Sequence, residues 1–251
     1  MQLLTQDDFI KIKLASCMHR VAKVLGRDLT ENDLVSLVSK YLLGDKVSPP
    51  VRNECIKNLA VLLEVLEMSK RERFASSYYE LQNDPKKWRI REIIAGQLGI
   101  LSRLFTEDTT IRIILPIAFN LCKDEVASVR AAACAEIYQM LDNLKKSDLA
   151  KMIIVENIKN FADYKKFTFR QSFIHMCEGL VNLQNEFITT FMPLFCKLAD
   201  DKVINVRISM AKIFRNLYKN KSKLILQKDM LTAFDKLLAD PSIDVRRQIE
   251  N

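Results

Sequence analysis

The sequence predicts an all-α fold in which about six antiparallel helix pairs stack into one α-solenoid. A short motif recurs, an Asp followed several residues later by an Arg and an apolar run, and its arginines are 39, 39, 40, 37 and 39 residues apart. Apolar residues behind each Arg return at helical intervals, as expected for amphipathic helices. The 251 residues include only 5 Gly and 6 Pro, and no strand-like alternation persists. A fixed period of this length is typical of repeat architectures.

The repeat covers the whole chain, so we expect residues 1–251 to form a single solenoid. The second helix of each unit should begin near the motif Arg, or near a Lys one period earlier: Lys13, Arg52, Arg91, Arg130, Arg170, Arg207 and Arg246. The chain starts with half a unit and stops within the helix after Arg246. Because solenoids need polar caps at their ends, we expect a fragment of a longer array.

Three columns of apolar residues predict the second helices. They stand three, seven and ten positions after the motif Arg, and these offsets keep to one face of an α-helix. The columns read Cys55, Ile94, Ala133, Phe173, Met210 and Ile249; Leu59, Leu98, Ile137, Cys177 and Phe214; and Leu62, Leu101, Met140, Leu180 and Leu217. Stacked pairs can bury such faces in one continuous core, which a single pair cannot do.

The first helix of each unit precedes the Asp of the motif, as in LTENDLVSLVSKYLL, TTIRIILPIAFNLC, EFITTFMPLFCKLA and KDMLTAFDKLLA. Pro116 and Pro193 both lie 14 residues before their motif Arg, inside these helices. Each predicts a bend, because proline removes a backbone donor and clashes with the preceding turn. Asp84-Pro85 and Asp240-Pro241 are typical of an N-cap followed by proline at the first helical position.

This arrangement resembles HEAT repeats, whose first helix often contains Pro and whose second helix opens with Asp and Val-Arg. The resemblance implies that the Asp and Arg residues are structural and form hydrogen bonds from one unit to the next. The resulting ladder would comprise Asp45, Arg52, Asp84, Arg91, Asp124, Arg130, Arg170, Asp201, Arg207, Asp240 and Arg246. We interpret these arginines as stacking residues and not as a phosphate-binding row.

The sequence contains no motif that indicates catalysis. The two histidines, His19 and His175, lie in no HExxH motif and near no cysteine pair with zinc spacing, the usual signs of a metal site. Phosphate-binding, nucleophile-elbow and dinucleotide-binding glycine motifs are absent. We therefore expect a non-enzyme with no cofactor and no metal. Six scattered cysteines and no secretion signal indicate reduced thiols in the cytoplasm or nucleus.

Lys and Arg number 39 against 31 Asp and Glu, which raises the question of an acidic partner. Lys86-Lys87 and Lys165-Lys166 fall in turns within repeats, whereas Lys70–Arg73, Lys145-Lys146 and Lys219–Lys223 fall in links between repeats. In a solenoid these turns lie at opposite edges, so the charge forms two weak rows in place of one phosphate-tracking stripe. Nucleic acid is therefore less favoured than solvated edges or an acidic protein. No apolar run reaches the roughly 18–20 residues of a membrane span, and we expect no membrane partner.

The order of the motifs resembles the final repeats of the protein phosphatase 2A scaffold subunit and, more closely, the C-terminal repeats of the protein phosphatase 4 regulatory subunit 1 family. The resemblance covers roughly residues 10–246 and rests on DPKKWRIREIIAGQL, ILPIAFNLCKDEVASVRAA, KFTFRQSFIHMCEGL, FMPLFCKLADDKVINVRISMAKIFRNL and DPSIDVR. It implies a non-catalytic scaffold whose partner is a Ser/Thr protein phosphatase catalytic subunit of the protein phosphatase 4 type, bound along the within-repeat turns.

The resemblance also implies which residues contact that partner. A matching Trp-Arg turn touches the catalytic subunit in the 2A scaffold, and the equivalent positions here are Trp88, Arg89, Ser128, Thr168 and Asn205. Trp88 is the only tryptophan, and Trp and Arg are enriched among interface hot spots. The alternative is that Trp88 folds over the apolar face of the neighbouring unit. Alternative functions are a nucleic-acid-binding HEAT module of the condensin type and a transport-receptor fragment.

Overall fold

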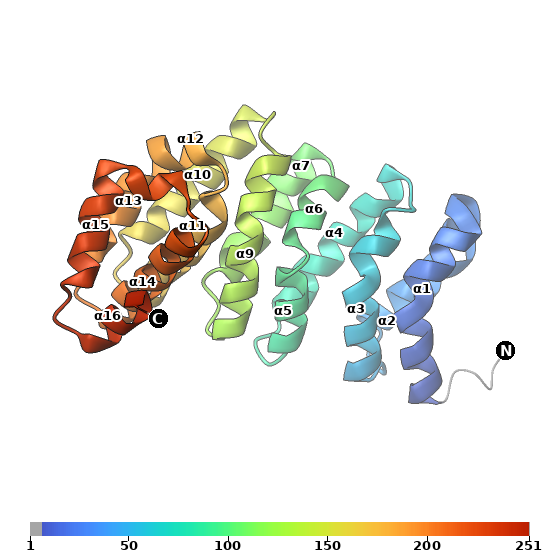
Figure 1. The fold of residues 1–251 in the computed structure, drawn as a ribbon. Helices are drawn as coiled ribbons and strands as arrows, with labels where there is room; N and C mark the ends of the chain where they lie inside the picture. Colours follow the sequence, from blue (N-terminus) through green and yellow to red (C-terminus); the bar gives the residue numbers. More distant parts are fainter. Residues whose placement is uncertain (1–6, 251) are drawn as a thin grey trace.

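The computed structural model describes residues 7–250, and over this range the chain is an all-α solenoid (Figure 1). Helix pairs follow one another from α1 at one end to α16 at the other, and no strand occurs in the described range. The fold class predicted from the repeat is confirmed.

One row of the solenoid consists of the second helices of the repeats. These are α1 (Asp8–Leu29), α3 (Pro49–Leu63), α5 (Trp88–Ala95) with α6 (Leu98–Leu104), α9 (Ala127–Asn143), α11 (Phe167–Leu180), α14 (Ile204–Lys219) and α16 (Ile243–Glu250). From α3 onward, each of these units begins its second helix three residues before the motif Arg. The within-repeat turns therefore place every motif Arg in the first turn of a helix.

The other row consists of the first helices of the repeats. Its main members are α2 (Val35–Leu43), α4 (Met68–Gln82), α8 (Leu115–Leu121), α10 (Asp148–Ala162), α13 (Met192–Lys197) and α15 (Lys228–Leu238). Short helical turns α7 (Glu107–Thr109) and α12 (Gln184–Glu186) lead into two of them. The links between repeats, which precede this row, lie at the opposite edge from the within-repeat turns (Figure 1).

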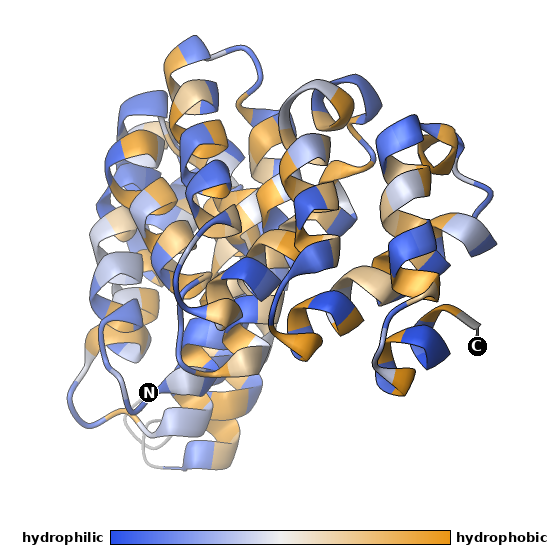
Figure 2. Cartoon of the chain, turned by 90° about the vertical axis from the view of Figure 1, so that its left-hand side faces the viewer, coloured by the Kyte–Doolittle hydropathy of each residue, from blue (hydrophilic) through white to orange (hydrophobic). Residues whose placement is uncertain are grey.

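The core lies between the two rows and follows the apolar columns of the sequence. Every column residue is buried except Ile249, which is half-buried. Hydrophobic and hydrophilic residues share the surface of each helix, while the connecting turns are largely hydrophilic (Figure 2). Aromatic rings link the rows near the C-terminal end, where Phe195 lies 5.7 Å from Phe214 between ring centroids. Burying one large apolar side chain contributes about 1.5–3 kcal/mol, so the columns supply much of the stacking energy.

The two prolines of the first helices follow wide helical turns. A π-helical turn at Thr110–Ile114 ends two residues before Pro116, and another at Phe187–Phe191 ends two residues before Pro193. Proline cannot donate to the helix ladder and crowds the carbonyl four residues back, and a wider turn relieves that crowding. A third π-helical turn, Thr30–Leu34, has no proline nearby, so proline is not the only cause of this feature.

The second helix that carries Trp88 is interrupted, whereas the sequence predicts a continuous one. The interruption falls at Gly96 and Gln97, between α5 and α6. The buried Gln97 amide donates to the carbonyl of Ile56 at 2.8 Å, and the buried Tyr78 hydroxyl donates to Gln97 Oε1 at 3.1 Å. Glycine is a poor helix former, and the amide contacts tie the break to α3. They fix the position of α5 against the preceding repeat.

Candidate partner-binding edge

The within-repeat turns lie along one edge of the solenoid, the lower edge in Figure 1. At each turn the second helix of a repeat begins, so free backbone N–H groups and the positive end of the helix dipole face this edge. The residues predicted to bind a partner occupy equivalent places there. Trp88 and Arg89 are the first two residues of α5, while Ser128, Thr168 and Asn205 are the second residues of α9, α11 and α14.

Trp88 is half-buried and packs against the hydrophobic core, while Arg89 is exposed. The Arg89 guanidinium carbon lies 4.5 Å from the Trp88 ring centroid, a cation–π contact. Both residues line a groove of about 210 Å³ between α3 and α5. Its lining is completed by Pro49, Arg52, Asn53, Lys86, Lys87 and Ile90. Trp88 thus contacts the neighbouring repeat and also borders a surface groove.

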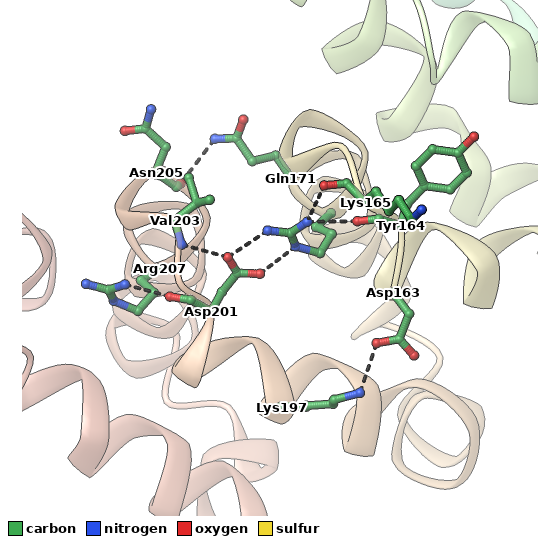
Figure 3. A network of polar contacts seen from close by, with 10 residues as sticks. Asp163, Tyr164, Lys165, Gln171, Lys197, Asp201, Val203, Asn205 and Arg207 are labelled. Carbon is green, nitrogen blue, oxygen red and sulfur yellow. Dashed lines mark hydrogen bonds and ion pairs between the residues drawn. The ribbon is translucent and has the colours of Figure 1, made fainter.

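The other three predicted residues differ in how they face solvent. Ser128 and Asn205 are exposed, and the Asn205 side chain points away from its helix (Figure 3). The Asn205 carbonyl accepts a 3.1 Å hydrogen bond from the Gln171 amide of the preceding repeat. Thr168 is half-buried, and its hydroxyl is buried without a partner among the described residues. The Thr168 hydroxyl therefore faces inward, unlike the side chains of Ser128 and Asn205.

Three arginines of the ladder form ion pairs with an Asp of the following repeat. Arg91 Nε lies 2.6 Å from Asp124, Arg170 Nε lies 2.5 Å from Asp201, and Arg207 Nε lies 2.6 Å from Asp240. Each carboxylate also accepts from Nη2 of the same arginine, at 3.3, 2.9 and 3.2 Å respectively. Bidentate pairs of this kind add directional strength. All three are almost excluded from solvent.

Each of these aspartates also shapes its own turn. Asp201 Oδ1 accepts the Val203 N–H at 2.8 Å, and the Asp201 carbonyl accepts Arg207 Nη1 at 2.6 Å (Figure 3). Burial alone would raise the pKa of Asp201. Hydrogen bonds from Arg170 and Val203, together with the arginine charges, outweigh the effect of burial, so the pKa lies below its ordinary value. The same set of causes, with Arg207 as the donor, leaves the pKa of Asp240 lowered. The carboxylates of Asp201 and Asp240 are therefore held ionised.

The number of residues in the turn distinguishes the paired aspartates from the others. Asp124, Asp201 and Asp240 each stand six residues before the Arg of their own repeat. Asp45, Asp84 and Asp163 stand seven residues before theirs. In the described six-residue turns, the Asp carboxylate accepts the N–H two residues on and also reaches the preceding repeat. The extra residue in the longer turns moves the helix start one position further from the Asp.

The longer turns leave part of the expected ladder without Asp–Arg pairs between repeats. Asp84 instead pairs with Lys87 at 2.7 Å and accepts the Lys86 N–H at 3.0 Å. Asp163 pairs with Lys197 at 2.9 Å (Figure 3), and Asp45 is exposed in its turn. The expectation that every motif Asp and Arg joins two repeats is therefore too broad. Asp–Arg spacing, which is visible in the sequence, is the signal that separates the two cases.

The remaining ladder arginines bond to turn carbonyls. Arg52 Nη2 donates to Gly44 O at 2.6 Å, and Arg130 Nη1 donates to Asp124 O at 2.8 Å and to Glu125 O at 2.9 Å. Arg246 donates to Asp240 O. These bonds hold each turn against its own helix. They do not connect one repeat to the next.

The described residues show little reactive chemistry along this edge or elsewhere. Within residues 7–250, no group of three or more His, Cys, Asp or Glu side chains is placed to hold a metal ion. Burial raises the pKa of the Cys55 and Cys196 thiols to about 12, and such thiols are poor nucleophiles near neutral pH because they stay protonated. In the same range, no helix has the length and apolar character required to cross a membrane.

Comparison with known proteins identifies relatives of the chain. The HEAT repeat family matches residues 114–144. The chain is 30% identical over 236 residues to human serine/threonine-protein phosphatase 4 regulatory subunit 1, covering 89% of the chain and 24% of that protein. For the Rattus norvegicus counterpart the identity is 31% over 218 residues, covering 82% of the chain and 22% of that protein. The chain thus spans about a quarter of the length of the curated relatives it matches.

Among solved structures, the chain is similar to the designed armadillo repeat protein YIII(Dq)4CqI. The TM-score is 0.42 and the sequence identity 13%, with 87% of this chain and 97% of that chain covered.

Proposed function

We propose that the chain, which matches the HEAT repeat family over residues 114–144 and is similar to serine/threonine-protein phosphatase 4 regulatory subunit 1, acts as a non-catalytic regulatory scaffold. Its partner is a Ser/Thr protein phosphatase catalytic subunit of the protein phosphatase 4 type. The observation that carries this proposal is the similarity to regulatory subunits over 89% of the chain. The within-repeat edge supports it, because equivalent residues of successive repeats stand there in one row.

The proposed mechanism is geometric. Packed helices lie about 8–10 Å apart, so the first turns of α5, α9, α11 and α14 present contact points at regular intervals to a globular partner. Arg89, Ser128 and Asn205 are exposed at these points. Trp88, held by its contacts with the core, supplies a rigid aromatic anchor at one end of the row. Rigid anchors lose little side-chain entropy on binding, which favours affinity.

The exposure of Arg89 makes it the sharpest test of this edge. We expect Arg89→Ala to weaken binding of recombinant protein phosphatase 4 catalytic subunit by about 30-fold or more, since hot-spot truncation typically costs at least 2 kcal/mol. The melting temperature of this variant should stay unchanged. Trp88→Ala should weaken binding as well, with some loss of stability because the ring packs on the core. Binding is measured by biolayer interferometry and melting by circular dichroism.

A matched control removes an exposed aromatic residue and an exposed Arg from elsewhere on the solenoid. Tyr79 is 50% exposed and Arg73 is exposed on α4, so Arg73→Ala with Tyr79→Ala changes similar chemistry away from the proposed edge. This control should bind the catalytic subunit as the unaltered chain does. Full binding by Arg89→Ala, or equal loss in the control, would show that the partner does not use this edge. The absence of any binding by the unaltered chain would refute the scaffold proposal itself.

A further inference from the structure

Arg52 differs from the paired arginines in one donor atom. In Arg91, Arg170 and Arg207, Nε donates to a carboxylate of the next repeat at 2.5–2.6 Å. In Arg52 the same atom is buried and has no hydrogen-bond partner among the described residues. A buried donor left unpaired costs about 1–3 kcal/mol. The Arg Nε atom that donates to an aspartate in three repeats therefore has no acceptor at Arg52.

The aspartate that would occupy the equivalent place next to Arg52 is Asp84. Asp84 is the aspartate of the following repeat, but it stands in a seven-residue turn and pairs with Lys87 at 2.7 Å. The other arginine followed by a long turn is Arg130, and its Nε does not appear among the buried unpaired atoms of the described residues. Arg52 is thus the one ladder arginine in this range with a buried, unused Nε.

Arg52 also lines the groove between α3 and α5, whose volume is about 210 Å³. Three further cations, Lys86, Lys87 and Arg89, share that lining, and no acidic residue does. Asp84 pairs with one of these cations, Lys87. The groove therefore has a net positive charge and an aromatic wall formed by Trp88, and one of its lining arginines, Arg52, carries an unsatisfied donor atom.

We propose that this groove binds an Asp or Glu side chain from an extended acidic segment of the protein partner. Its carboxylate would take the place that an aspartate of the next repeat takes in the paired steps, accepting from Arg52 Nε. The methylene groups of the bound residue would pack on Trp88, and Arg89 would close the positive rim. Charge complementarity selects an acidic segment over a basic or neutral one. The partner's identity rests on the proposed function, whereas recognition of a carboxylate rests on the groove alone.

The single tryptophan of the chain lines this groove, so its fluorescence reports directly on occupancy. The probe is an acetylated, amidated triglutamate peptide at fixed low ionic strength, and the matched triglutamine peptide is the neutral control. Triglutamate should change the Trp88 emission saturably, while triglutamine should not. Sodium phosphate at matched ionic strength is the competitor: it should compete more weakly than triglutamate, because a free anion lacks the methylene groups that pack on Trp88.

Two substitutions remove the same charge from different places. Arg52→Gln should raise the triglutamate dissociation constant at least tenfold, whereas Arg73→Gln, an exposed arginine on α4, should leave it unchanged. Arg52→Lys keeps the charge but loses the Nε donor, and it should also weaken binding. Circular dichroism checks that each variant is folded. No saturable change, equal weakening by Arg73→Gln, or tighter binding of phosphate than of triglutamate would overturn the proposal.

The same variants separate this inference from the proposed function. If Arg52→Gln captures the phosphatase catalytic subunit as well as the unaltered chain while Arg89→Ala does not, the acidic-segment inference is wrong and the scaffold proposal stands. If triglutamate binds through Arg52 but the catalytic subunit is not captured at all, the groove chemistry is supported and the scaffold proposal is wrong.

Discussion

The inter-repeat ion pairs lead to a direct prediction about Asp201. Its carboxylate accepts three hydrogen bonds, from Arg170 Nε at 2.5 Å, Arg170 Nη2 at 2.9 Å and the Val203 N–H at 2.8 Å. The Asp201 and Arg170 side chains are only 5% and 9% exposed. We predict that Asp201→Asn lowers the free energy of unfolding by about 3 kcal/mol. This substitution keeps the shape of the side chain and removes its charge.

The magnitude follows from the burial of the pair. Removing one partner of a buried ion pair costs about 3–5 kcal/mol, because the other charge stays behind without compensation. Asn retains one oxygen that can still accept the Val203 N–H, so the lower end of this range applies. Asp163 provides the matched control. It pairs with Lys197 at 2.9 Å, but the two side chains are 63% and 66% exposed, and such surface pairs contribute about 0–1 kcal/mol.

Urea unfolding at pH 7, followed by circular dichroism at 222 nm, measures both variants against the unaltered chain. Because solenoids can unfold from one part to the next, the first transition is the one to compare. Asp163→Asn should shift its free energy by less than about 1 kcal/mol. The reasoning would be refuted if Asp201→Asn fell within that same limit, or if Asp163→Asn cost as much as Asp201→Asn.

Two further predictions concern the same turns. The pKa values of Asp201 and Asp240 are lowered in the folded chain. Their stabilising contribution is therefore complete above the unfolded pKa of about 3.9 and is lost as the pH falls through the lowered folded pKa values. Urea midpoints measured between pH 7 and pH 2.5 should drop in that acid range, and the drop should be less steep for Asp201→Asn. Deletion of Lys86 converts DPKKWRIR into DPKWRIR, which has the six-residue Asp-to-Arg spacing of DPSIDVR. Asp84 should then pair with Arg52, and the melting temperature should rise by about 2–4 °C for each 1 kcal/mol gained. An unchanged or lower melting temperature would count against the role of the Asp-to-Arg spacing.

The helices and the core could be predicted from the sequence because they depend on periodicity. Apolar columns at helical offsets determine which face is buried whatever the details of the turns, and the column residues are buried accordingly. The break between α5 and α6 was not predictable from periodicity, because the apolar columns continue across Gly96, from Ile94 before it to Leu98 and Leu101 after it. Only the contact of the Gln97 amide with Ile56 O, 41 residues earlier in the chain, shows why the helix is interrupted there.

The candidate site was less predictable because it depends on turn geometry. Family resemblance points to the five positions at the start of the second helices of the repeats. Burial of the Thr168 hydroxyl, however, depends on packing that no local pattern encodes. The Asp–Arg pairing lies between these cases. A difference of one residue between Asp and Arg is visible in the sequence, yet its meaning emerges only when paired and unpaired repeats are compared in space.

That one-residue difference also connects stability with binding. A six-residue turn lets one carboxylate accept an N–H of its own turn and neutralise the arginine of the preceding repeat, as Asp201 does. A seven-residue turn directs Asp84 to Lys87 and leaves Arg52 Nε buried and unpaired, and Arg52 lines the same groove as Trp88. Satisfying Arg52 within the chain would stabilise the stack at this step but occupy the donor that the groove offers to a partner. The turn before α5 therefore gives up part of the stacking energy and keeps an acid-binding surface beside the aromatic anchor of the proposed interface.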